Sequence, residues 1–163
     1  MTSLHREDSE CFGLALAEAH AGYDEGGLPI GAALATSDGV IAVGRNRRVQ
    51  SGSAIRHAEM DCLENAGRLP ASTYRGATLY STLSPCYMCS GAIVLFGIPR
   101  LVVGGEIDFE GPRAVLEGNG VEVVLRHDKG SLDLIDRFIA EHPAVWAEDI
   151  GVAFDAEPGP PTL

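Results

Sequence analysis

The chain has 163 residues, the size of one domain that can bury a core around a site. Hydrophobic residues make up 45% and charged residues 21%, a balance that excludes a disordered or fibrous chain. The 12 Lys and Arg against 23 Asp and Glu give a formal net charge of -11, which disfavours nucleic acid as a partner.

Apolar spacing and turn residues predict alternating helices and strands. The apolar residues from Phe12 to Tyr23 recur every three or four positions, which indicates one face of a helix over residues 8–25. The Asp38-Gly39 turn joins apolar runs at 30–35 and 40–43, as in a β-hairpin. Further helices are expected at 57–66, 86–96, 112–117 and 132–140, and further strands at 78–82, 101–103 and 121–125.

This alternation favours an α/β fold, a three-layer α/β/α sandwich around a five-stranded mixed sheet. We expect a single domain over residues 1–151 and a disordered tail over residues 152–163, which are rich in Pro.

The ends and cysteines of the chain bear on its location. The first ten residues carry charges and no apolar stretch, and no later run has the length of a membrane span. The cysteines are therefore better interpreted as thiols or metal ligands than as disulfides; they are Cys11, Cys62, Cys86 and Cys89. We expect a cytoplasmic protein with no membrane partner.

Three residues form a candidate zinc site. Cys86 and Cys89 have C-x-x-C spacing at the start of a predicted helix, where the helix dipole favours thiolates, and His57 begins another helix. Three protein ligands leave the fourth tetrahedral position of Zn²⁺ open for water, as in catalytic sites. Glu59 follows His57 by two residues and is placed to move protons to and from that water without binding the metal.

The pattern His57-Ala58-Glu59 with Pro85-Cys86-x-x-Cys89 resembles the H-x-E…P-C-x-x-C signature of zinc-dependent nucleobase deaminases. From Leu14 to Gly151 the sequence also resembles the fungal-type cytosine deaminases of the cytidine deaminase superfamily. The segments that carry this resemblance are residues 22–31, 63–68, 79–86 running on to 97–100, and 146–151. It implies a homodimer that hydrolyses cytosine to uracil and ammonia, by attack of zinc-bound hydroxide with Glu59 as proton shuttle.

The resemblance also implies a pocket for a free pyrimidine, closed by a C-terminal helix. Asn46 would bond the ring N1 and O2 edge, the Ala58 amide would hold O2, and Asp149 with the Ser84 carbonyl would bind the amino group. The implied apolar walls are Ile30, Phe109, Trp146 and Ile150.

Several residues depart from the pattern of this family and leave the substrate ring open. Ala58 stands where Gly is usual, Tyr87 where Asp is usual, and Ala147 where an aromatic residue is usual. Ala58 instead matches the tRNA adenosine deaminases and guanine deaminases of the superfamily. Isocytosine, guanine or a triazine is therefore an alternative substrate, and tRNA a weaker one. A non-catalytic zinc-stabilised binding module is a further alternative, although it has no need of Glu59.

The run Arg45-Asn46-Arg47-Arg48 is the one place where a local basic patch could form in this acidic chain. Arg45 also replaces a His of the family pattern. We interpret the run as the solvated end of a strand.

Overall fold

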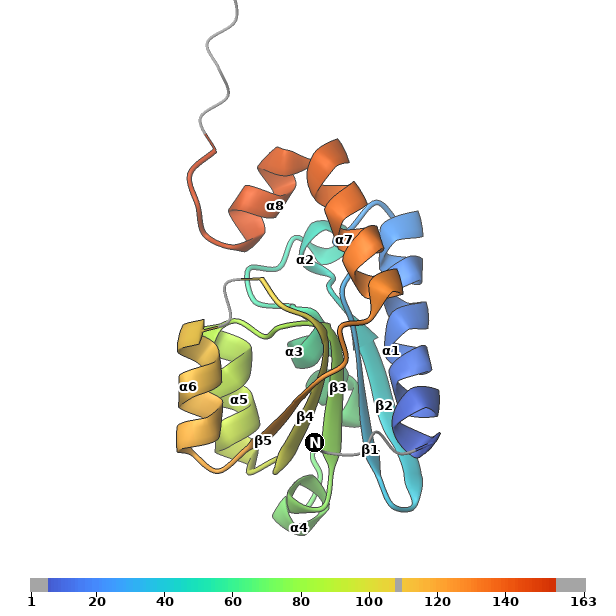
Figure 1. The fold of residues 1–163 in the computed structure, drawn as a ribbon, viewed down its shortest axis with the longest axis vertical. Helices are drawn as coiled ribbons and strands as arrows, with labels where there is room; N and C mark the ends of the chain where they lie inside the picture. The colour runs from blue at the N-terminus through green and yellow to red at the C-terminus, as the bar shows by residue number, and fades with distance from the viewer. Residues whose placement is uncertain (1–5, 108–109, 155–163) are drawn as a thin grey trace, which may run out of the picture.

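The computed structural model describes residues 6–107 and 110–154. A five-stranded sheet of order β2-β1-β3-β4-β5 organises the chain (Figure 1). Its strands are β1 (Gly31–Thr36), β2 (Gly39–Arg45), β3 (Thr78–Leu83), β4 (Arg100–Gly105) and β5 (Glu122–Leu125). β1 pairs antiparallel with β2 and β3, whereas β3–β4 and β4–β5 are parallel. The predicted mixed sheet is confirmed.

Helices cover both faces of this sheet. They are α1 (Arg6–Asp24), α2 (Arg48–Ser51), α3 (Ala58–Ala66), α4 (Ala71–Arg75), α5 (Tyr87–Phe96), α6 (Glu110–Gly118), α7 (Lys129–Glu141) and α8 (Pro143–Asp149). Figure 1 shows α1 and α7 on one face and α3, α5 and α6 on the other. The three-layer α/β/α arrangement predicted from the sequence is therefore confirmed.

The alternation of side chains along β4 explains why the sheet needs helices on both faces. Leu101 and Val103 pack into one core cluster with Ile93 of α5, while Val102, between them, packs into a second cluster with Phe12 of α1. All three β4 residues are fully buried, as expected for a strand within a covered parallel sheet.

Close packing fixes α3 against β2. A Cβ atom at Gly44 of β2 would overlap the backbone nitrogen of Cys62 in α3, so only glycine lets the two elements approach this closely. This contact brings the first turn of α3 to the end of the sheet where β3 leads into α5. The site described below lies at this end.

Some sequence predictions need correction or lie outside the described residues. The short helices α2 and α4 were not predicted, α8 was implied by the resemblance without bounds, and the ends of the other elements differ by a few residues at most. Residues 152–154 form neither helix nor strand, while residues 155–163 of the expected tail and Phe109 lie outside the described part of the chain. In the described ranges, 6–107 and 110–154, every helix is too short or too polar to cross a membrane.

The interpretation of Arg45, Arg47 and Arg48 as a solvated strand end is wrong. The side chains of Arg45 and Arg48 are largely buried, and all three arginines form ion pairs with carboxylates of the same chain. Arg45 pairs with Glu18 and Glu25 of α1 and its neighbouring turn. These arginines join elements of the fold instead of forming a basic patch.

Candidate active site

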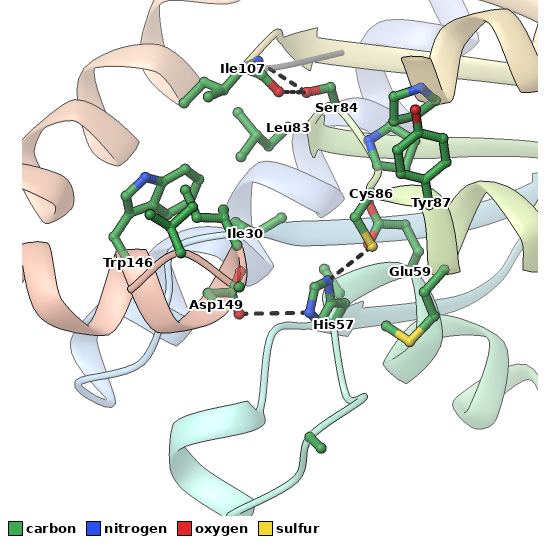
Figure 2. A pocket seen from close by; sticks show the side chains of 18 residues that line it. Ile30, His57, Glu59, Leu83, Ser84, Cys86, Tyr87, Ile107, Trp146 and Asp149 are labelled. Carbon is green, nitrogen blue, oxygen red and sulfur yellow. Dashed lines mark hydrogen bonds and ion pairs between the residues drawn. The ribbon is translucent and has the colours of Figure 1, made fainter. Parts of the chain in front are cut away.

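Two helix starts bring the three predicted zinc ligands together. His57 is the N-cap of α3, Cys86 is the N-cap of α5, and Cys89 lies in the first turn of α5. Their ligand atoms all lie within 4.8 Å of one another. Zinc bound tetrahedrally to a sulfur and a nitrogen would separate those two atoms by about 3.6 Å. The Cys86 Sγ–His57 Nδ1 distance is 3.7 Å, so the residues fit the ion (Figure 2).

The local electrostatics favour the metal-binding thiolate form of one ligand, Cys86. A hydrogen bond with Cys89, followed by one with His57, lowers the pKa of the Cys86 thiol to about 4. The same contact with Cys86, together with burial, raises the pKa of Cys89. Cys86 is thus favoured as a thiolate, the form that binds zinc, and Cys89 loses its proton when it binds the metal.

Glu59 lies in the first turn of α3 with its carboxyl group held inside the protein. Its side chain is 3% exposed, and Ser81 Oγ of β3 lies 2.7 Å from Glu59 Oε1 and 2.7 Å from the Leu83 carbonyl oxygen. The Ser81 hydroxyl has one hydrogen for two oxygen neighbours, so both contacts are satisfied together when Glu59 carries a proton. Burial raises the pKa of Glu59, which also favours a carboxyl group that can accept and return a proton.

A cavity of about 450 Å³ opens beside these residues. Figure 2 shows the Trp146 side chain and Tyr87 on opposite sides of the space, with His57, Cys86 and Asp149 between them. Trp146 and Asp149 belong to α8, which crosses the end of the sheet (Figure 1). The C-terminal helix therefore supplies one wall of the cavity, as the resemblance implied.

A carboxylate of α8 also contacts the predicted metal ligands. Asp149 Oδ1 lies 3.7 Å from His57 Nε2, on the side of the imidazole opposite Cys86. Asn46 Nδ2 donates to the same oxygen at 3.1 Å. The metal ligands and α8 are thereby joined through one carboxylate.

Most of the predicted site residues line the cavity. The group consists of His57, Glu59, Cys86, Ala58, Ser84, Asp149, Ile30, Trp146 and Ile150. Cys89 is buried beneath Cys86. Asn46 is fully buried and does not line the cavity, because its amide is engaged with Asp149 and with the backbone N–H of Arg48.

Sequence reasoning missed several residues of the site. Leu83, Met88, Ile107 and Pro112 add apolar lining, and Tyr87 stands exposed at its rim. Ser81 carried only a weak signal, because β3 also contains the polar residues Thr78 and Thr82. Its contact with Glu59 depends on the packing of α3 against β3 and could not be predicted from that signal alone.

Residues 5–105 match the family model of the cytidine and deoxycytidylate deaminase zinc-binding region. The chain belongs to this deaminase family. A cytosine deaminase of Candida albicans is 49% identical to this deaminase over 146 residues, which cover 89% of the chain and 97% of that relative. The zinc expected from the donor set of His57, Cys86 and Cys89 is the metal of the matched region.

Two other comparisons show similarity in part of the sequence and in the fold. A tRNA-specific adenosine deaminase of Buchnera aphidicola is 40% identical over 101 residues, covering 61% of this chain and 66% of that relative. The solved guanine deaminase from Nitrosomonas europaea has the same fold, with a TM-score of 0.69 and 24% identity over 86% of this chain and 87% of that one.

Proposed function

We propose that this deaminase hydrolyses free cytosine to uracil and ammonia. The observation that carries the proposal is the similarity to the cytosine deaminase of Candida albicans, which extends over nearly the whole length of both chains. The similarity to the tRNA-specific adenosine deaminase covers a smaller share of this chain and of that relative. The cavity is lined mostly by apolar side chains with a few convergent polar groups, which suits a small flat ring.

We assign the metal ligands to His57, Cys86 and Cys89 and proton transfer to Glu59. When bound, zinc supplies a water-derived nucleophile at neutral pH. Glu59 accepts one proton of the attacking water and delivers it to the ring nitrogen, then accepts the second proton from the hydroxyl added to the ring carbon and delivers it to the departing amine, so that uracil and ammonia form. Ser81 holds the carboxyl group of Glu59 at the cavity wall during these transfers.

The remaining polar groups are assigned to the ring edges. Asp149 and the Ser84 carbonyl bind the exocyclic amino group, and the Ala58 amide holds O2. The resemblance assigns Asn46 to the N1 and O2 edge; its second amide hydrogen, beyond the one it donates to Asp149, can donate to O2 when a bound ring draws this side chain to the cavity. Ile30, Trp146 and Ile150 form the apolar walls, and the resemblance adds Phe109 to them.

Nucleic acid is not proposed as a substrate. The net charge of -11 repels phosphate, and Arg45, Arg47 and Arg48 are already paired with carboxylates within the chain. A cytoplasmic homodimer stays a prediction. Exposed Leu95 and Phe96 on α5 support an interface between two copies, and light scattering after gel filtration tests it.

Ammonia release from a panel of rings tests the proposed substrate. The panel contains cytosine, isocytosine, guanine, a triazine, cytidine and tRNA, each assayed with the zinc-loaded wild-type enzyme and with Glu59→Gln as the control. We expect the highest kcat/KM for cytosine. A higher value for guanine or isocytosine would contradict the choice of ring, and release from tRNA alone would contradict the free-base assignment.

A further inference from the structure

Among Arg45, Arg47 and Arg48, it is Arg48 whose side chain contacts α8, the helix that forms one wall of the cavity. Its guanidinium forms two ion pairs there, with Nη1 2.9 Å from Asp149 Oδ1 and Nη2 2.7 Å from Glu148 Oε1. Arg47, by contrast, pairs with Asp61 of α3. The two carboxylates that Arg48 contacts differ in exposure, since Asp149 is 4% exposed and Glu148 is 66% exposed. The Arg48–Asp149 pair is therefore the buried half of the contact.

The contacts of Asp149 are unevenly distributed over its two oxygens. Oδ1 accepts from Arg48 Nη1 and from Asn46 Nδ2, and His57 Nε2 lies 3.7 Å from it. Among residues 6–107 and 110–154, no hydrogen bond is made to Oδ2. Because Asp149 lines the cavity, this second oxygen is available to a bound ring.

The geometry points to a new assignment: Arg48 is a positioning residue that fixes Asp149 so that Oδ2 meets the amino group of the substrate. This inference rests on the proposed function, in which Asp149 binds that group. The charge-assisted bond at Oδ1 sets the rotation of the carboxylate, and the guanidinium plane holds it with little freedom. Arg48 is itself anchored, because Asn46 Oδ1 accepts its backbone N–H at 3.0 Å. The strand end, Arg48 and α8 thus form one connected unit.

A double-mutant cycle tests this role. We compare Arg48→Met, Asp149→Asn and the double variant for kcat and KM on the ring that the wild-type enzyme turns over, with zinc content and thermal unfolding measured alongside. Displacing Asp149 by about 1 Å is expected to lower kcat on the order of 10²-fold in Arg48→Met. If Arg48 acts through Asp149, the double variant equals Asp149→Asn within about threefold. Losses that multiply would show an independent effect and overturn the assignment.

Glu148→Gln is the matched control, because it removes the exposed partner of the same guanidinium and leaves the Asp149 pair in place. Its kcat is expected to stay within about twofold of the wild-type value, since exposed ion pairs contribute little. A loss as large as that of Arg48→Met would mean that Arg48 anchors α8 in general, which would overturn a specific role at Asp149.

If Arg48→Met does not fold, the same cycle is run with Arg48→Gln, which keeps a neutral donor on a shorter side chain. If both unfold, Arg48 has a structural role and the assignment is overturned. If the wild-type enzyme is active and Arg48→Met has the same kinetics, the inference about Arg48 is refuted and the proposed function still stands. A wild-type enzyme that releases no ammonia from any ring overturns the proposed function together with this inference.

Discussion

Replacing Glu59 by Gln tests the proton-transfer step with a change of one atom. The Gln side chain has the same shape, and its amide can keep a hydrogen bond with Ser81 Oγ, which lies 2.7 Å from Glu59 Oε1. Because Glu59 is only 3% exposed, the substitution also removes a buried ionisable group. We therefore expect Glu59→Gln to fold and to keep its zinc, with a free energy of unfolding within about 1 kcal/mol of the wild-type value.

The effect on turnover should be much larger than the effect on folding. A positioned general acid–base contributes about 10² to 10⁴ in rate, equal to about 2.7 to 5.4 kcal/mol of activation free energy. Ser81→Ala should have a smaller effect of about tenfold on kcat, because Glu59 keeps its proton chemistry but loses one side-chain contact of about 1 kcal/mol.

Steady-state ammonia release, zinc analysis and denaturant unfolding of both variants provide the measurement. Glu59→Gln should bind cytosine with little change in affinity while kcat falls at least 10²-fold. Near-normal turnover in a folded, zinc-loaded Glu59→Gln would refute the proton-shuttle assignment. It would mean that another group moves the protons.

Three further substitutions probe the metal site, the cavity and the fold. Cys86→Ala should lose both zinc and turnover by elemental analysis and ammonia assay, and full activity in the metal-free variant would contradict the metal assignment. Trp146→Ala should raise KM for cytosine about tenfold, equal to about 1.4 kcal/mol, and an unchanged KM would remove Trp146 from the cavity wall. Gly44→Ala should lower the free energy of unfolding by about 1 to 3 kcal/mol in a denaturant titration. Its control, Gly13→Ala on the open face of α1, should cause no loss, and equal losses would contradict the packing argument.

The fold and the metal site could be predicted because their signals are local in the sequence. Apolar periodicity gives the long helices and buried strands, and the Asp38-Gly39 turn gives the hairpin. The C-x-x-C spacing places Cys86 and Cys89 on one helix start, so that only His57 must come from elsewhere. The short helices α2 and α4 were missed because a helix of one turn has too few residues for periodicity to appear.

The contacts that orient the site could not be predicted because they join residues far apart in the sequence. Ser81 meets Glu59 across 22 positions, and Arg48 meets Asp149 across 101. The charge of the arginine run indicated solvent exposure, but carboxylates brought together by the fold pair with each of the three arginines. The exposure of these arginines is thus set by tertiary contacts that the local sequence pattern does not contain.

One competition assay tests the central claim most directly. The zinc-loaded enzyme is incubated with an equimolar mixture of cytosine and cytidine, and all four bases and nucleosides are followed by chromatography with ammonia measured in parallel. The account predicts uracil and ammonia in equal amounts and no uridine, because the cavity closed by α8 holds a free ring. Formation of uridine at a comparable rate, or uracil without ammonia, would contradict it.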